Sequence, residues 1–340
     1  MKALVKKHPQ KGIWMENVPE PNCGDNEIKI KITHTAICGT DLHIYNWDSW
    51  AQRMLRLPVI IGHEFCGIIQ EIGKNIQRYQ EGQRVSGEGH IICGYCRNCR
   101  AGKQHLCDST KGIGVNRNGA FAEYLVLPES NIWPISDGTR SEIASFFDPF
   151  GNAVHSINCF NIVGEDLLIT GAGPIGLLSV AIGKFIRARN IVITDINDYR
   201  LTLAKQLGAT KTINIKKDSI KNCFSELNIK HGFDVGLEMS GNGQALNEML
   251  SSMYYGGKIV LLGLLPKNTC IDWDNIIFKG LQVKGVYGRK MYETWYKMDQ
   301  LIKSGLDLSK IITHKFPISS FEEAFEVVSS GQCGKVIMEW

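Results

Sequence analysis

The chain has 340 residues, of which 44% are hydrophobic and 21% are charged, and its formal net charge is +4. This length allows separate domains with their own cores, and the composition is that of a globular protein rather than a disordered one. Lysine and arginine occur throughout without blocks of like charge, which argues against nucleic-acid and membrane-surface partners. The start of the chain lacks a signal-peptide core, and no apolar run approaches the roughly 18 residues that span a bilayer. We therefore expect a cytoplasmic protein that acts on small molecules.

The first third of the chain is rich in predicted β-strands. Residues 27–33 alternate charged and branched side chains, as a half-buried strand does. Residues 59–61, 66–72 and 84–86 are similar short runs, separated by glycine, proline and asparagine. A small barrel or sandwich is expected here.

The pattern changes after residue 151, where predicted strands and helices begin to alternate and continue to about residue 287. Such alternation indicates βαβ units and a parallel sheet, so we expect an α/β protein with a doubly wound second domain. Helical patterns at 292–304 and 321–328 and a final strand at 335–340 follow, and we expect this tail to return to the first domain. The predicted divisions of the chain are 1–148, 149–290 and 291–340.

Eleven cysteines occur in the chain, an odd number, and four of them fall between residues 93 and 107. Their separations of three, three and eight residues allow four thiolates to close a tetrahedral shell around zinc, as in structural sites. Free or oxidised thiols and an iron–sulfur cluster are the alternatives. Thiolates that hold a metal suit a reducing compartment better than a disulfide framework does. The predicted ligands of this structural zinc are Cys93, Cys96, Cys99 and Cys107.

A second group of metal-binding side chains lies between residues 38 and 64. Cys38 stands in a glycine-bounded turn, and His63 and Glu64 directly follow the strand predicted at 59–61. A thiolate, an imidazole and a carboxylate are the ligand types of a zinc site that keeps one position open for a substrate. Glu64 could bind the ion directly, or sit behind the other ligands and move in when substrate leaves. An isolated cysteine is more often part of a core, which is the alternative for Cys38.

Asp148 lies at the predicted domain junction, within Phe147-Asp-Pro-Phe-Gly-Asn152. Its carboxylate could serve as a fourth zinc ligand or stand behind the ligands. The alternative is that it caps the turn before Pro149.

A glycine-rich segment, Gly171-Ala-Gly173-Pro-Ile-Gly176, directly follows the apolar strand predicted at 166–170 and opens a helix. With a strand before it and a helix after it, this pattern indicates a dinucleotide site, where the backbone approaches a pyrophosphate at the helix start. Asp195 ends the next predicted strand, nineteen residues after Gly176, and its carboxylate can accept from ribose hydroxyls. Because an acid there disfavours a 2′-phosphate, we expect NAD rather than NADP.

Arg200 is the one residue that argues for the other cofactor, since it could pair with a 2′-phosphate. A place on the helix surface or against the adenine is equally compatible with its position. Two later segments, Leu262 to Leu264 and Val286 to Tyr287, come at the ends of predicted strands. There they would meet the nicotinamide half of the cofactor.

Zinc beside a nicotinamide cofactor points to alcohol oxidation. The metal acidifies a coordinated alcohol, and the resulting alkoxide can expel a hydride to C4 of NAD. The released proton needs a path to solvent. Thr40 and His43 could supply it, because the hydroxyl can take the substrate proton and the imidazole can pass it on. This pair could instead be structural, since a histidine three residues after a threonine is common.

These motifs resemble those of the zinc-containing medium-chain dehydrogenases, and within that family those of members that oxidise L-threonine. The resemblance covers essentially the whole chain and includes Ser86 to His90, Gly114 to Arg117, Phe147 to His155 and Ile311 to His314. It implies a GroES-like catalytic domain, a Rossmann domain, a catalytic and a structural zinc ion in each subunit, and a homotetramer. It also implies oxidation of the β-hydroxyl of L-threonine to 2-amino-3-oxobutanoate with NAD, in threonine breakdown toward glycine.

Matched residue by residue, the resemblance assigns Cys38, His63 and Glu64 to the catalytic zinc and the four clustered cysteines to the structural zinc. It assigns Thr40 and His43 to the proton relay. The residues expected to bind NAD, from the glycine motif or by resemblance, are Gly171, Gly173, Ile175, Gly176, Asp195, Arg200, Leu262, Gly263, Leu264, Val286 and Tyr287.

Asp148 matches a position at which some relatives carry glutamate as a further zinc ligand. Because aspartate is one methylene shorter, a role behind the ligands is expected here, and we count Asp148 with the catalytic residues.

The residues alone support zinc, NAD and secondary-alcohol oxidation, whereas the amino-acid substrate comes from the resemblance. Oxidation of a polyol or a vicinal diol on the same fold is the nearest alternative. A non-catalytic zinc protein that binds NAD as a redox sensor is the alternative of another class. A threonine site needs an acceptor for the ammonium and donors for the carboxylate. The unranked side chains that could line it are Trp47, Glu88, His90, Asn152 and His155.

Overall fold

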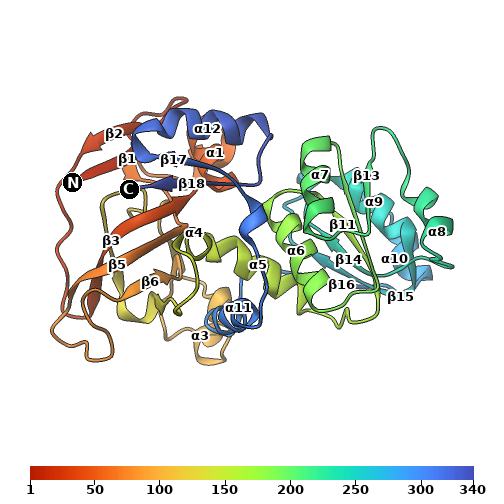
Figure 1. Ribbon diagram of the computed structural model, residues 1–340, viewed down its shortest axis with the longest axis horizontal. Coiled ribbons are helices and arrows are strands. Elements are labelled where there is room, and N and C mark those ends of the chain that lie inside the picture. The colour runs from red at the N-terminus through yellow and green to blue at the C-terminus, as the bar shows by residue number, and fades with distance from the viewer.

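The chain folds into a β-rich half and an α/β half that lie side by side along the long axis of the molecule, with helix α5 (Phe147–Ile157) between them (Figure 1). The computed structural model describes all 340 residues. None of its helices has both the length and the apolar character needed to cross a bilayer.

The β-rich half is built on a seven-stranded sheet whose main path runs β10-β6-β5-β3-β18-β17, with β9 also paired to β3. In the long strand β3 (Glu27–Ala36), Ile28, Ile30 and Ile32 are buried and form part of the core of this half. The strands predicted at 27–33, 59–61, 66–72 and 84–86 are all confirmed. The other strands of this half are β1 (Lys2–Lys6), β2 (Trp14–Asn17), β4 (Val59–Ile60), β5 (Phe65–Ile72), β6 (Arg84–Gly87), β7 (His90–Ile91), β8 (Lys111–Gly112), β9 (Tyr124–Pro128) and β10 (Ile132–Pro134).

The end of the chain joins this same sheet. Strand β18 (Lys335–Glu339) pairs antiparallel with β3, and β17 (Ile312–Pro317) pairs parallel with β18. Helix α12 (Phe321–Ser330) connects the two, and helix α11 (Glu293–Lys303) lies below the sheet beside α5 (Figure 1). The tail therefore completes the β-rich half, as expected from the sequence.

The α/β half contains a six-stranded parallel sheet of order β13-β12-β11-β14-β15-β16. This is the doubly wound order in which the strand sequence reverses between β11 and β14, the position where such sheets bind dinucleotides at the carboxyl ends of the strands. The predicted fold class is therefore confirmed. The strands are β11 (Asp166–Thr170), β12 (Asn190–Asp195), β13 (Lys211–Asn214), β14 (Phe233–Glu238), β15 (Met253–Leu261) and β16 (Gln282–Gly285), and the helices are α6 (Pro174–Phe185), α7 (Asp198–Leu207), α8 (Cys223–Glu226), α9 (Gly243–Ser252) and α10 (Trp273–Phe278).

The two halves share one hydrophobic core that passes through α5. It includes Ala36 and Cys66 from the β-rich half, Phe150 from α5, and Leu167 and Ile169 from the parallel sheet. Because core packing resists small displacements, α5 fixes the two halves relative to each other near the expected site. The remaining helices are α1 (Gly39–Asn46), α2 (Ser49–Met54), α3 (Arg97–Arg100) and α4 (Ser141–Ser145).

Candidate active site

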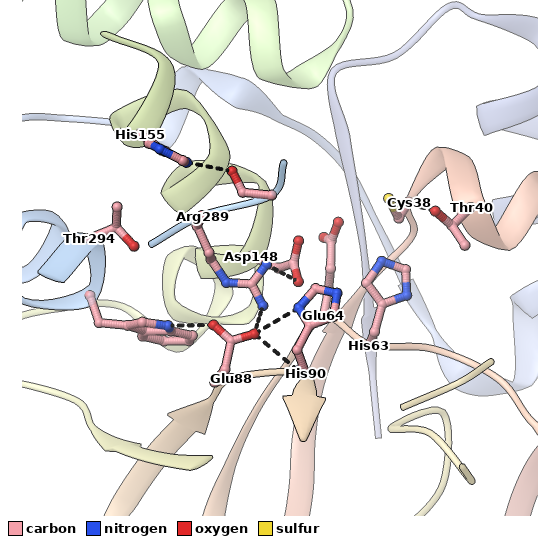
Figure 2. Close-up of polar contacts among 12 residues, drawn as sticks. Cys38, Thr40, His63, Glu64, Glu88, His90, Asp148, His155, Arg289 and Thr294 are labelled. Carbon is pink, nitrogen blue, oxygen red and sulfur yellow. Dashed lines mark hydrogen bonds and ion pairs between the residues drawn. The ribbon is translucent and has the colours of Figure 1, made fainter. Parts of the chain in front are cut away.

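Cys38, His63 and Glu64 come together although the first two are twenty-five positions apart in the sequence. Their ligand atoms all lie within 4.8 Å of one another (Figure 2). Cys38 is the N-cap residue of α1 rather than part of an isolated turn, and its amide donates to Asp41 at 2.9 Å. His63 and Glu64 lie between β4 and β5. The structure thus brings together the three residues that sequence spacing alone could not join.

Negative charge is concentrated around His63. Its Nδ1 lies 3.8 Å from Oδ1 of Asp41, a fully buried oxygen without a hydrogen-bond partner. Burial opposes charge on the imidazole, but the neighbouring Cys38 and Asp41 raise the pKa of His63 well above its usual value. A thiol, an imidazole and carboxylates packed this closely, with an acceptor left unpaired, suit a bound cation.

Glu64 is buried and is held from behind by a residue near the end of the chain. One carboxylate oxygen, Oε2, accepts from Lys335 Nζ, and both side chains are at most 1% exposed. Lys335 also donates to the carbonyl of Ile37 at 2.8 Å. The other oxygen of Glu64, Oε1, is buried and has no hydrogen-bond partner. This oxygen is available to a ligand on the Cys38 and His63 side.

Asp148 does not join that group of three. It lies in the first turn of α5, and its Oδ2 is 2.7 Å from Nη1 of Arg289. The alternative that it caps the turn before Pro149 is wrong, because Asp148 lies inside α5, whose N-cap is Phe146, and α5 has no side-chain cap. Asp148 instead forms a buried ion pair beside the three residues (Figure 2).

Arg289 also pairs with Glu88, so one guanidinium joins two carboxylates. Glu88 accepts in addition from His90 Nδ1 at 2.9 Å and from the Trp295 indole at 3.0 Å. Although burial opposes ionisation, Arg289 and His90 lower the pKa of Glu88 to about 2. With all these donors, Glu88 is occupied within the protein. Sequence reasoning missed Arg289 and Trp295, since neither lies in a motif.

Three other side chains were considered for substrate binding, and they differ in whether a buried polar atom has no hydrogen-bond partner. His155 Nδ1 is engaged with the Gly288 carbonyl at 3.0 Å. The Trp47 ring lies under the buried Lys6 ammonium, 5.1 Å from its centroid. Asn152, one turn after Asp148 on α5, has a buried side-chain oxygen with no partner. Of these, only Asn152 presents an unpaired buried acceptor.

Thr40 and His43 lie on α1, three residues apart and so on the same side of the helix. Thr40 Oγ1 is 4.0 Å from Cys38 Sγ. The His43 side chain is 57% exposed, and its Nδ1 is 2.5 Å from Oδ2 of Asp48. One end of this pair therefore borders the metal-competent group and the other reaches solvent. Asp48 was not singled out from the sequence.

The four clustered cysteines also converge, and all eleven cysteines are unpaired thiols. Their sulfur atoms lie within 4.8 Å of one another, with 3.6 Å between Cys93 and Cys107. Backbone amides of Cys93, Cys96 and Cys99 donate to neighbouring sulfur atoms at 3.4 to 3.5 Å. Such donors stabilise thiolates. The lobe contains the short helix α3, and it buries Cys99 and Cys107.

The glycine-rich turn after β11 has the shape that a pyrophosphate requires. Gly171 has φ +91°, and a Cβ at Gly176 would lie 1.9 Å from the Gly171 carbonyl oxygen. Gly173 is the N-cap of α6 without a side-chain cap, and a Cβ built there meets nothing within 4 Å. The first amides of α6, including that of Ile175, are thus open to an anion.

The other expected cofactor residues lie along the same edge of the sheet. Asp195 ends β12 and accepts from the amides of Ala172 and Ile196 at 2.6 and 2.7 Å, which fixes its orientation. Arg200 is half-buried on α7, with an unpartnered buried Nε. Leu262 to Leu264 and Val286 to Tyr287 follow β15 and β16, and the Tyr287 ring lies 6.5 Å from the His90 ring of the other half.

Comparisons with known proteins agree with this geometry. Residues 24–137 match the family model of the alcohol dehydrogenase GroES-like domain, and residues 174–304 match that of zinc-binding dehydrogenases. Over the full length of both proteins, the chain is 58% identical to the L-threonine 3-dehydrogenase of Xanthomonas oryzae pv. oryzae and 56% identical to that of Marinomonas sp.. The chain belongs to the L-threonine 3-dehydrogenase family.

Solved structures similar to this L-threonine 3-dehydrogenase family member share its architecture at lower identity. An Escherichia coli CFT073 alcohol dehydrogenase, solved with the cofactor NADH, matches with a TM-score of 0.91 and 27% identity, covering 100% of this chain and 99% of that one. The 2R,3R-butanediol dehydrogenase of Bacillus subtilis matches with a TM-score of 0.90 and 25% identity over the same shares. The family member therefore has the fold of zinc-binding dehydrogenases, with a four-cysteine group and a separate Cys, His and Glu group.

Proposed function

We propose that this protein oxidises the β-hydroxyl of L-threonine to 2-amino-3-oxobutanoate with NAD, as a step in threonine breakdown toward glycine. The observation that carries the proposal is the full-length identity of 56% and 58% to L-threonine 3-dehydrogenases. The Cys38, His63 and Glu64 group beside a dinucleotide-type sheet edge supports it.

We assign a catalytic zinc to Cys38, His63 and Glu64 and a structural zinc to Cys93, Cys96, Cys99 and Cys107. The mixed donor set and the unpaired oxygen of Glu64 fit the first ion, and the converging sulfur atoms fit the second. When bound at the first site, zinc supplies a Lewis acid that acidifies a coordinated alcohol.

The protein's own residues handle the proton that the alcohol loses. Thr40 borders Cys38 and can accept this proton at its hydroxyl, and His43 can carry it to solvent, where its side chain is 57% exposed. Asp148, fixed by Arg289, acts from behind the metal ligands through its charge rather than by ligation.

For NAD, the turn of Gly171, Gly173 and Gly176 with the Ile175 amide would hold the pyrophosphate. Asp195 would hold the adenosine ribose, and its charge supports NAD over NADP. The residues assigned to the rest of the cofactor are Arg200, Leu262, Gly263, Leu264, Val286 and Tyr287.

A substrate comparison tests the proposal. Purified protein should form NADH from L-threonine faster than from sorbitol or 2,3-butanediol at equal concentration. The similarity to a 2R,3R-butanediol dehydrogenase makes the diol the alternative to include. A faster rate on the diol or the polyol would overturn the substrate assignment, and NAD binding without NADH formation from any alcohol would favour a redox sensor.

We also propose a homotetramer in which the β16 edge of the parallel sheet is one contact. Strand β16 pairs only with β15, and all four of its residues are exposed. Large exposed apolar side chains lie in the neighbouring strand β15 and in α10, the helix that precedes β16: Tyr255 at 67% exposure, Trp273 at 61%, Ile277 at 68% and Phe278 at 77%. An open edge with such a patch suits a second copy of the chain. Phe278→Asp should lower the mass measured by light scattering, and an unchanged mass would contradict this contact.

We further propose that the chain divides at 1–148, 149–290 and 291–340 and that the protein is cytoplasmic. The separation of the seven-stranded sheet, which includes β17 and β18, from the six-stranded parallel sheet supports the divisions. The unpaired cysteines support a reducing compartment.

A further inference from the structure

We infer that Asp48 is a positioning residue for the proton relay, which it serves by orienting the imidazole of His43. The inference rests on the proposed dehydrogenase function and adds a third member to the Thr40 and His43 pair. Asp48 stands between α1 and α2, where it is the N-cap residue of α2.

The Asp48 carboxylate is itself held in place. Its Oδ1 accepts from the amides of Trp50 and Ala51 at 2.9 and 3.0 Å, at the start of α2. Its Oδ2 faces His43 Nδ1 at 2.5 Å. Trp47, in the left-handed conformation with φ 54°, ends α1 and brings Asp48 back beside His43. The orientation of the carboxylate is therefore set by backbone amides before it contacts the imidazole.

This contact determines which nitrogen of His43 can accept a proton. The amides of Ala51 and Trp50 and the contact with His43 lower the pKa of Asp48 despite partial desolvation, so the side chain is a carboxylate at neutral pH. A carboxylate only accepts hydrogen bonds, so Nδ1 must carry the proton. In neutral His43 the lone pair is then on Nε2. This tautomer can take a proton from Thr40 at Nε2.

The same pair contributes little to the stability of the fold. The side chains of His43 and Asp48 are 57% and 37% exposed, and exposed ion pairs have small stabilising effects. The Trp50 ring, 5.9 Å from that of His43, flanks the imidazole without hydrogen bonding to it. A loss of turnover in a variant of Asp48 can therefore be separated from unfolding.

The decisive variants keep the cap and change the partner of His43. Asparagine and serine cap helices about as well as aspartate, so Asp48→Asn and Asp48→Ser should retain α2. In Asp48→Asn an amide donor facing Nδ1 would move the ring proton to Nε2. We expect kcat for L-threonine to fall by about 10- to 100-fold in both variants. KM values, zinc content and the unfolding midpoint should stay as in the unmodified protein.

A matched control is Asp307→Asn, which changes another exposed aspartate that accepts from an amide two residues on, that of Ser309 at 2.8 Å. Its kcat should be unchanged. Added imidazole should raise the turnover of Asp48→Asn and leave that of the unmodified protein unchanged, because a mobile base replaces the misoriented one. A purely structural role would give neither rescue nor a selective loss of kcat.

A second measurement does not depend on turnover. Selective ¹⁵N-histidine labelling, with His43 assigned from the signal lost in His43→Asn, should show Nδ1–H in the unmodified protein and Nε2–H in Asp48→Asn. An Nε2–H tautomer in the unmodified protein would overturn the inference, as would full kcat in either Asp48 variant or in His43→Asn. Absence of NADH formation from L-threonine by the unmodified protein would overturn the proposed function, and the tautomer would still decide the orienting role.

Discussion

The two metal-competent groups of this protein are built in opposite ways. The four clustered cysteines come from residues 93–107, and their sulfur atoms receive hydrogen bonds from their own segment. Cys38, His63 and Glu64 come from separate elements, and Glu64 is held by Lys335, 271 positions later in the chain. The first group is a local structure, whereas the second exists only when the whole domain is folded. Structural and reactive sites in one chain therefore depend on folding to different degrees.

The largest expected effect is on turnover, and it should distinguish the two groups when one ligand of each is substituted. Cys38→Ser should lose one zinc per chain and reduce turnover by about 10³-fold or more, since the metal contributes several kcal/mol to charge stabilisation. Cys96→Ser should also lose one zinc but make residues 93–107 sensitive to protease before turnover falls. Metal analysis and limited proteolysis measure this difference. Equal effects of the two substitutions on turnover and proteolysis would mean that the groups do not have separate roles.

A substitution of Lys335 tests whether the Cys38, His63 and Glu64 group depends on distant residues. Lys335→Met leaves the Glu64 carboxylate buried without its partner, which should cost about 3–5 kcal/mol in the free energy of unfolding. Zinc should be lost from the Cys38 group and kept by the cysteine lobe. Urea denaturation and metal analysis check both results, with Lys297→Met, a surface lysine paired with Glu293, as the control. A Lys335 variant with full stability and full zinc would refute the supporting role.

A third expectation concerns acid stability of the buried ion pairs behind the site. The pKa of Glu88, lowered to about 2 from an unfolded value near 4.5, means that its stabilising effect is present above about pH 4.5. That effect, on the order of 3 kcal/mol, should be lost as the pH falls from about 4.5 toward 2. Urea midpoints between pH 7 and pH 3 should therefore fall less steeply in Glu88→Gln. Parallel curves for the two proteins would contradict this.

The smallest expected effect concerns the end of the relay. His43→Asn should keep zinc content and NAD binding but reduce kcat by about 10- to 100-fold. The loss should be greatest at low pH, where solvent hydroxide is too scarce to accept the proton. Steady-state kinetics across pH, with zinc analysis, would check this. Turnover that matches the unmodified protein at every pH would remove His43 from the mechanism.

The same contrast explains what could be predicted from the sequence. The cysteine spacing is a local pattern, and so are the strand, glycine turn and helix around Gly173. The four-cysteine site, the dinucleotide site and the parallel sheet could therefore be predicted from short segments of sequence. Lys335 and Arg289 were not, because a buried cation has no sequence mark that distinguishes it from a surface one. The sequence could not decide whether Asp148 caps a turn or lies in a helix, because a proline after an aspartate is common both in turns and in the first turn of a helix.

Asp48 shows a different limit. Asp-Ser-Trp after a helix is recognisable as an N-cap, but its contact with His43 depends on the left-handed turn at Trp47. Within the group considered for the substrate, only the fold showed that Glu88 is already fully hydrogen-bonded and that the Asn152 oxygen is unpaired.

The most direct measurement is NADH formation from L-threonine by one preparation before chelation, after chelation, and after zinc is restored, with the zinc content measured at each stage. Turnover should disappear when the zinc assigned to Cys38, His63 and Glu64 is removed, while the cysteine lobe keeps its ion, and it should return when zinc is restored. Full turnover in protein that lacks zinc at the Cys38 group would contradict the proposed chemistry.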